Sequence, residues 1–468
     1  MNSQIYTPDE PISSIATALA PAALGIVRVS GKDCIRLVAG KFSRKQALLD
    51  APGNTIVYGW LENSGIPVDE VMVAVYRAPK SFTGEDMAEI FCHGGPAVVT
   101  AVHNLMLASG FRQALPGEYT FRAYINGKTD LTKAEAVREI IGSRTDASRS
   151  HAAGRLAGSL YREIDSIKKL VTDTLAAVEV EIEYPEDEET IADTFDRGEI
   201  LEAVRRLESL NDSWKGEKLY QEGARVVLCG RTNAGKSSLF NALLKEERAI
   251  VSDLEGTTRD WIESWADFDG IPVRLFDTAG LRQTEDVVES EGVKLSLSLS
   301  READAVLYVV DSGAGIQPDD EEFLSSCDVP VVLVWNKCDL PGGCALSRKN
   351  ISGIRNAAGH PPFRAEFRIS VKSGAGLDGI FSGIKEILAQ GTTADRIQAG
   401  LGSARQKESV AAALESARHA LVSADEHYSL DAVVQDLEDV LASLGEVTGD
   451  VTPDDVLGSV FSRFCVGK

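Results

Sequence analysis

The sequence lacks the cysteine patterns of a disulfide framework or a zinc site. Its seven cysteines are odd in number and scattered over 468 residues, with no C-x-x-C pair and no histidine at zinc spacing. Reduced thiols are therefore expected. The opening residues MNSQIYTP contain no charged n-region and no apolar stretch, and no hydrophobic run is long enough to span a bilayer. We expect a cytoplasmic protein that does not associate with membranes.

Positive charge is also scarce. The chain has 48 Lys+Arg and 71 Asp+Glu residues, which gives a net charge of -23. This charge argues against a protein that binds nucleic acid through a general basic surface. Any contact with RNA must be local. The acidic stretch at 179–189 lacks the acid and glycine pattern of a calcium loop, so we interpret it as a solvated face without a ligand.

A glycine-rich loop is present between an apolar run and a helical pattern. The run Val226 to Leu228 has the length of a buried strand, and a G-x-x-x-x-G-K-S motif follows before helical spacing begins. Such glycines let backbone N–H groups point at phosphates, the lysine reaches the outer phosphates, and the serine hydroxyl suits Mg2+. We predict a phosphate-binding loop with nucleotide contacts at Gly230, Asn233, Ala234, Gly235, Lys236, Ser237 and Ser238.

The other parts of a nucleotide switch follow in chain order. Thr258 can offer its hydroxyl to Mg2+, as in switch I, and Asp277 can hold Mg2+ through a water in switch II. The apolar runs at 305–310 and 330–334 suit parallel buried strands. The second ends at an N-K-C-D sequence, whose Asp339 can accept two adjacent N–H groups that adenine lacks. We predict GTP as the ligand of a doubly wound α/β domain, with further contacts at Thr257, Thr258, Asp277, Gly280, Asn336, Lys337, Asp339, Ser370 and Lys372.

Catalysis needs an explanation, because Leu281 stands where many GTPases carry a water-orienting glutamine. Asn233 and the oxygen-rich loop at 252–256 could cage a monovalent cation beside the phosphates. Arg282 and Glu289 lie just downstream. The residue chemistry leaves open the alternative of a slow GTPase that needs a protein activator in trans.

The flanking segments predict two further architectures. Strand-like runs at 25–31, 55–59 and 71–76 and a helical pattern at 98–107 indicate a small α+β domain, and Thr83 with the acids after it is typical of a helix start. Apolar residues at helical spacing predict one long helix over 146–182, a second near 200–210, and two more at 410–421 and 430–444. We expect the helices to form a bundle in which the α/β domain is inserted. The terminal C-x-G-K is either a frayed tail or a tail held in a site.

These motifs resemble the MnmE (TrmE) family of tRNA-modification GTPases over essentially the whole chain. The similar segments are Ser81 to Glu89 with His93-Gly94-Gly95, 116–120, 126–136, the switch motifs and the terminal 464–468. The resemblance implies a tetrahydrofolate-binding, dimerising α+β domain at 1–124, a helical domain at 125–220 and 386–468, and an inserted P-loop G domain at 221–385.

The resemblance also implies an activity. The family hydrolyses GTP with stimulation by K+, works with an FAD-dependent GidA-type partner, and adds an aminomethyl or carboxymethylaminomethyl group to C5 of the wobble uridine of certain tRNAs. The one-carbon donor would be 5,10-methylenetetrahydrofolate or 5-formyltetrahydrofolate, and the FAD would belong to the partner.

Site roles carry over from the family by position. The folate contacts would be Arg28, Glu89, Lys128 and Lys468; the K+ ligands Asn233, Ser252, Leu254 and Thr257; the Mg2+ ligands Ser237 and Thr258. Glu289 would orient the attacking water without an outside activator, and Arg282, Asn233 and Cys465 would be further catalytic residues. Two departures stand out: residues 17–24 replace a Gly-Arg-Gly-rich turn, and Gln406 stands where histidine is common.

Two other function classes compete with this interpretation. One is an RNA-associated GTPase of ribosome assembly without folate chemistry, which would be expected to carry a basic RNA-binding appendage. The other is a G domain that regulates a folate enzyme without RNA. Recovery of tRNA together with a GidA-type partner would separate them.

Overall fold

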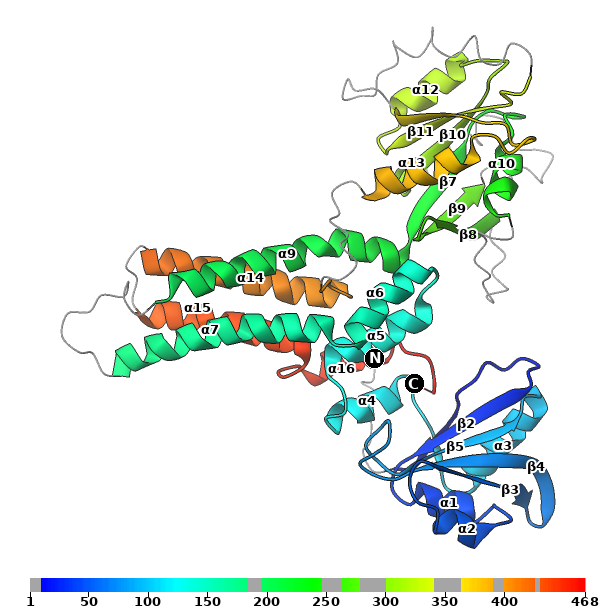
Figure 1. The fold of residues 1–468 in the computed structure, drawn as a ribbon, viewed down its shortest axis with the longest axis vertical. Helices are drawn as coiled ribbons and strands as arrows, with labels where there is room; N and C mark the ends of the chain where they lie inside the picture. The colour runs from blue at the N-terminus through cyan, green and yellow to red at the C-terminus, as the bar shows by residue number, and fades with distance from the viewer. Residues whose placement is uncertain are drawn as a thin grey trace. The chain divides into compact units, whose positions relative to one another are not determined.

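The computed structural model describes residues 10–183, 195–245, 262–277, 300–340, 363–389, 399–425 and 430–467. Their contacts define two compact units, and each is described by itself. The first comprises Met1–Arg138, Leu156–Leu207 and Glu408–Lys468, and the second Glu139–Arg155 and Glu208–Lys407. Figure 1 shows the helices and strands in chain order.

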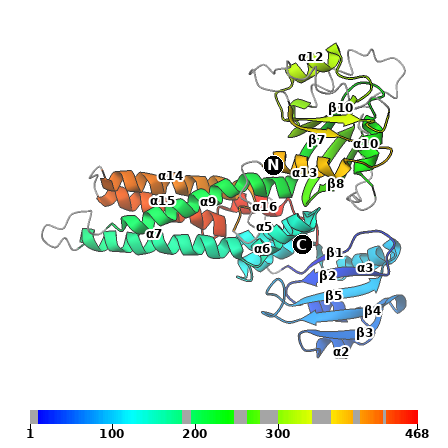
Figure 2. The ribbon, with the colours of Figure 1, turned by 45° about the horizontal axis from the view of Figure 1, so that its top comes forward.

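A six-stranded sheet forms the N-terminal part of the first unit. Its strand order is β3-β4-β5-β2-β1-β6, and every neighbouring pair is antiparallel except β1 with β6. Figure 2 shows the strands from β1 to β3 side by side in this order. The strands are β1 (Ile12–Ile15), β2 (Leu24–Ser30), β3 (Thr55–Asn63), β4 (Ile66–Tyr76), β5 (Met87–His93) and β6 (Arg112–Gln113).

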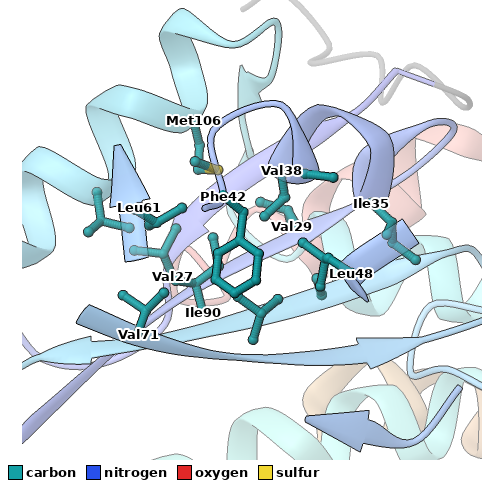
Figure 3. Packing of buried hydrophobic residues seen from close by; sticks show 14 of the residues in the cluster. Val27, Val29, Ile35, Val38, Phe42, Leu48, Leu61, Val71, Ile90 and Met106 are labelled. Carbon is teal, nitrogen blue, oxygen red and sulfur yellow. The ribbon is translucent and has the colours of Figure 1, made fainter. Parts of the chain in front are cut away.

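One face of this sheet is buried beneath three helices, α1 (Cys34–Ala39), α2 (Lys45–Leu49) and α3 (Pro96–Ala108). Alternate strand residues point to opposite faces of a sheet, and here Val71, Val73 and Val75 of β4 are buried in the core with Phe42 and Met106. Figure 3 shows Leu61, Val71, Ile90 and Met106 around the ring of Phe42. The predicted strands at 25–31, 55–59 and 71–76 and the helix at 98–107 are confirmed.

The expected helix start after Thr83 is wrong, because the residues that follow pair as strand β5. Glu85 and Asp86 therefore do not lie in the first turn of a helix. Instead, Glu85 accepts hydrogen bonds from Ser30 and Arg122, and Asp86 accepts them from Arg77 and from the backbone N–H of Ala78. Long-range ion pairs and strand pairing therefore override the local capping pattern.

Helices form the remainder of the first unit and part of the second. Their bounds are α4 (Glu118–Ile125), α5 (Leu131–Gly142), α6 (Asp146–Leu156), α7 (Ser159–Glu183), α9 (Arg197–Glu222), α14 (Ala404–Asp425), α15 (Leu430–Thr448) and α16 (Asp454–Phe461). The predicted single helix at 146–182 is wrong, because Gly158 takes a φ of 87° and separates α6 from α7. Glycine adopts this left-handed conformation at no steric cost. Nothing described in the structure forms a helix able to cross a membrane.

The second unit is built on a doubly wound sheet of order β12-β11-β10-β7-β9-β8, with only the edge strand β8 antiparallel. Its elements are β7 (Ala224–Cys229), α10 (Lys236–Leu243), β8 (Ile262–Phe268), β9 (Ile271–Asp277), β10 (Ala305–Asp311), α12 (Pro318–Ser326), β11 (Val331–Asn336), β12 (Phe363–Arg368) and α13 (Leu377–Ala389). One apolar cluster packs α10 and α13 on one face of the sheet, and another packs α12 on the opposite face. This α/β domain interrupts the helical sequence, as predicted.

Candidate nucleotide site and N-terminal site

The phosphate loop joins the buried strand β7 to helix α10. Gly230 has a φ of 134° and Gly235 a φ of 99°, a region that residues with a Cβ rarely adopt. A Cβ on Gly230 would lie 2.2 Å from the carbonyl oxygen of Val309, and one on Gly235 would lie 2.2 Å from Nδ2 of Asn336. The loop thus passes directly against strand β10 and against the N-K-C-D sequence at 336–339, which we call the base-recognition motif. Only glycine fits at these two positions.

The lysine of the motif is held inside the loop. Lys236 is 8% exposed, and its Nζ donates to the carbonyl oxygens of Gly230 and Arg231, each at 2.8 Å. Ser237 and Ser238 are exposed at the start of α10. The positive end of a helix, backbone N–H groups and an ammonium are the groups that bind phosphate.

The base-recognition motif is tied to this loop. Asn336 donates from Nδ2 to the Ala234 carbonyl at 3.0 Å, and its Oδ1 accepts the Val371 N–H at 3.3 Å. Lys337 donates from Nζ to the Asn233 carbonyl at 2.7 Å. Sequence motifs that are about a hundred residues apart therefore share one rigid hydrogen-bonded frame.

Asp339 is exposed beyond Lys337, with a pKa below its ordinary value. A hydrogen bond from Ser370 is the main cause of the lowered pKa, and the charge of Lys372 contributes. Both residues were predicted to contact GTP. A charged carboxylate facing outward here is the group that would accept guanine N–H donors.

Asp277, predicted to hold Mg2+ through a water, ends strand β9 and is 1% exposed. It pairs in register with Leu228 of β7, so it lies at the strand end from which the phosphate loop departs. The carboxyl ends of parallel strands are where ligands bind in such sheets. The other predicted switch and cation residues lie outside the described residues: Ser252, Leu254, Thr257, Thr258, Gly280, Arg282 and Glu289.

A second cluster of functional groups lies on the N-terminal sheet around Arg28. Its Nε and Nη2 donate to Glu89 Oε1 at 2.9 and 2.7 Å, and its Nη1 donates to the Gly467 carbonyl at 2.9 Å. The guanidinium lies 5.7 Å from the ring centre of Phe82 and 5.6 Å from that of Tyr119. The structure therefore brings together the predicted Arg28 and Glu89, and adds two aromatic rings that sequence reasoning missed.

The terminal residues 464–467 are held against this cluster. Phe464 is buried with Phe461 and Leu131, and the carbonyl of Cys465 accepts the Gly117 N–H at 3.5 Å. The Cys465 side chain is exposed. The described part of the tail is packed and not frayed; that the tail is held in a ligand site stays a prediction, and Lys468 itself lies outside the described residues.

Lys128, the remaining predicted folate residue, is exposed and donates from Nζ to the Pro79 carbonyl at 2.9 Å. Tyr76, which was not predicted, donates its hydroxyl to Glu89 Oε2 at 3.3 Å. Burial, followed by the neighbouring Glu89 charge, raises the pKa of Tyr76, so its hydroxyl stays protonated and donates at neutral pH. Across the described residues, no three His, Cys, Asp or Glu side chains gather as a metal site.

Comparison with known families gives a direct assignment. The family model for the MnmE helical domain matches residues 131–465, and the model for the GTP-binding protein TrmE N-terminus matches residues 11–128. The chain belongs to the MnmE (TrmE) family. The resemblance stated from the motifs is confirmed.

Curated relatives of this MnmE-family chain match it from end to end. The tRNA modification GTPase MnmE of Treponema denticola is 48% identical over 472 residues, covering 99% of both chains, and that of Borrelia turicatae is 40% identical with full coverage of both. Among solved structures, a variant of Aquifex aeolicus Era bound to GDP.AlF4- is 26% identical with a TM-score of 0.29, covering 41% of this chain and 66% of its own.

Proposed function

We propose that this MnmE-family protein is a GTP hydrolase that acts in tRNA modification. The observation that carries the proposal is the pair of hydrogen bonds by which Asn336 and Lys337 join the base-recognition motif to the phosphate loop. Relatives that align over the whole length are named tRNA modification GTPases. The deciding experiment is nucleoside analysis of tRNA after deletion of the gene: a modified wobble uridine should disappear, and an unchanged nucleoside profile would reject the proposal.

The finer proposal is addition of an aminomethyl or carboxymethylaminomethyl group to C5 of the wobble uridine, together with an FAD-dependent GidA-type partner. The acidic charge of the chain supports tRNA contact that the partner assists, because a net charge of -23 repels a phosphate backbone. The alternative of a ribosome-assembly GTPase would bind RNA without this partner. Capture of tRNA with the partner, and not without it, is the expected result.

Mg2+ and K+ are the ions proposed for the nucleotide site. Ser237 would hold Mg2+ at the start of α10 with Thr258, and Asn233, which is exposed, would hold K+ with Ser252, Leu254 and Thr257. A cation bound there would supply positive charge next to the phosphates as the transition state forms. Glu289 would orient the water and Arg282 would lie nearby.

Replacing K+ by Na+ is expected to lower GTP turnover by at least about tenfold, because Na+ is smaller and fits a cage of protein oxygens sized for K+ poorly. Turnover is measured by phosphate release at constant ionic strength and saturating Mg2+. The affinity for a fluorescent GDP analogue serves as the control and should be similar in both salts. Equal turnover in both salts would reject the cation cage.

Tetrahydrofolate is the ligand proposed for the cluster around Arg28. The Glu89 carboxylate suits the N–H donors of a pterin ring, the guanidinium suits the ligand's carboxylates, and Phe82 and Tyr119 offer aromatic surface. Lys128 and Lys468 would contribute further positive charge, and Cys465 would lie beside the ligand as a proposed catalytic residue.

Calorimetry is expected to detect binding of 5-formyltetrahydrofolate, and Arg28→Ala should weaken it by about 30-fold or more through loss of charge-assisted hydrogen bonds. Arg36→Ala, at an exposed arginine of the same domain, is the matched control and should leave the affinity unchanged. No binding heat with the wild-type protein would remove the folate assignment.

A homodimer through the N-terminal domain is the proposed assembly. On the sheet face opposite the core, Tyr58, Met72, Phe91 and Ile26 lie in one row across four paired strands. Tyr58 is 53% and Met72 41% exposed, and Ile56 beside them is 63% exposed. An apolar row of this kind on a sheet face favours burial against a second copy.

Met72→Glu is expected to convert the dimer to a single chain in light scattering, because a charge would be buried at the centre of the interface. The control is Val422→Glu, which places the same charge at a 47% exposed apolar residue of α14. A dimer that persists in Met72→Glu would contradict this interface.

A further inference from the structure

Asn233 and Lys337 share an unusual backbone conformation and a hydrogen bond. Both have a φ of 64°, in the left-handed region, although neither is glycine. The Lys337 ammonium donates to the Asn233 carbonyl at 2.7 Å. Asparagine enters this region more readily than most residues, whereas lysine rarely does, and such conformations persist where surrounding contacts hold them. The contact with Lys337 is such a restraint on the phosphate loop.

Lys337 is in turn held by Asp311. The Asp311 carboxylate accepts Lys337 Nζ through Oδ2 at 2.8 Å and the Gly313 N–H through Oδ1 at 2.9 Å, so both of its oxygens are used. Asp311 ends β10 and pairs in register with Asn336, the last residue of β11. It therefore lies at the sheet edge where nucleotide contacts gather.

Asp311 is charged at neutral pH. Its burial disfavours the charge, but Lys337 and the N–H groups of Gly313 and Ala314 outweigh the burial and lower its pKa. The Asp311 and Lys337 side chains are 28% and 33% exposed, so solvent screens the pair only in part.

The next carbonyl of the loop is fixed separately, since Asn336 Nδ2 donates to Ala234. With the Asn233 φ at 64° and its carbonyl held by Lys337, the peptide planes on both sides of the Asn233 Cα are set, and with them the direction of its Cα–Cβ bond. We infer that Asp311 is a positioning residue, which holds the Asn233 side chain in its cation-binding orientation by fixing Lys337. This inference rests on the proposed role of Asn233 as a K+ ligand.

The test is a K+ titration of GTP turnover with Asp311→Asn. Loss of the charged partner frees Lys337 and relaxes the Asn233 carbonyl, so the half-activating K+ concentration should rise about tenfold. The affinity for a fluorescent GDP analogue should change less than about threefold. Asp319→Asn, which removes the same charge from an exposed residue of α12, should match the wild type in both measurements.

The outcomes separate this inference from the function on which it depends. A wild-type protein that K+ does not stimulate would remove the cation role of Asn233 and the positioning role with it. Normal stimulation of the wild type, with an unchanged half-activating K+ concentration in Asp311→Asn, would overturn the positioning role alone. A loss of GDP affinity as large as the loss of K+ response would also overturn it, because Asp311 would then act on the base site.

A second pair of variants covers the case in which Asp311→Asn does not fold. Asp311→Glu and Asp311→Gln have the same shape, and only the first keeps the charge. Asp311→Glu should retain a K+ response at least about threefold stronger than that of Asp311→Gln. Equal responses in the two variants would reject the inference.

Discussion

Replacing Gly230 with alanine is expected to weaken GDP binding by at least about 100-fold and to abolish measurable GTP turnover. The φ of 134° is strained for any residue with a Cβ, and the new atom would lie 2.2 Å from the carbonyl oxygen of Val309. Val309 lies in β10, which pairs with β7 and with β11, so its backbone cannot withdraw. Backbone strain of about 1–3 kcal/mol and overpacking of a similar size must therefore be relieved by movement of the phosphate loop.

The measurement is a titration with a fluorescent GDP analogue, followed by turnover at saturating GTP. Gly315→Ala is the matched control, because Gly315 also has a positive φ, 68°, but no atom lies within 4 Å of the added Cβ. Alanine at Gly315 carries a milder backbone strain and no collision, and the nucleotide affinity of this variant should stay within about threefold of the wild type. An affinity for Gly230→Ala in that same range would show that the loop tolerates displacement.

The strand, loop and helix of the candidate nucleotide site were predictable because their information is local. A glycine pattern between a strand and a helix specifies the loop, and the strands β7, β9, β10 and β11 are apolar runs that the burial of a parallel sheet requires. Their order along the chain then specifies which strand ends meet. The same reasoning predicted Asn336 and Lys337, although not that their side chains would bond the loop carbonyls.

The features that were missed depend on distant contacts or on a single residue. Arg28 meets the Gly467 carbonyl across 439 positions, and Phe82 and Tyr119 flank it from separate segments. Asp311 becomes informative only through the register that places it beside Asn336. The helical spacing of apolar residues continues past Gly158, so periodicity alone predicted one helix. The backbone turns at Gly158 and divides it into α6 and α7. Pairing and packing decide such features, and a pattern read along one chain does not contain them.

Asp339→Asn is expected to lower the affinity for guanine nucleotides by at least about 100-fold. Guanine presents two adjacent N–H donors, and the Asp339 carboxylate, whose pKa Ser370 and Lys372 lower further, can accept both. Asparagine offers one acceptor and turns an N–H2 donor towards a guanine donor. Discrimination by hydrogen bonds is large because the mismatch leaves polar groups without partners.

The same substitution should create a new preference. Xanthine carries a carbonyl where guanine has its exocyclic amine, so the introduced asparagine side chain would donate to it while still accepting the neighbouring N–H. Calorimetric titrations with GDP and with XDP measure the change in preference, and Asp328→Asn, at an exposed residue of the same domain, should leave the order of affinities unchanged. If Asp339→Asn bound GDP as the wild type does, or gained nothing for XDP, Asp339 would not read the base. Reversal of the preference with the fold intact would instead assign base selection to this one side chain, independently of the ion and folate chemistry proposed elsewhere in the molecule.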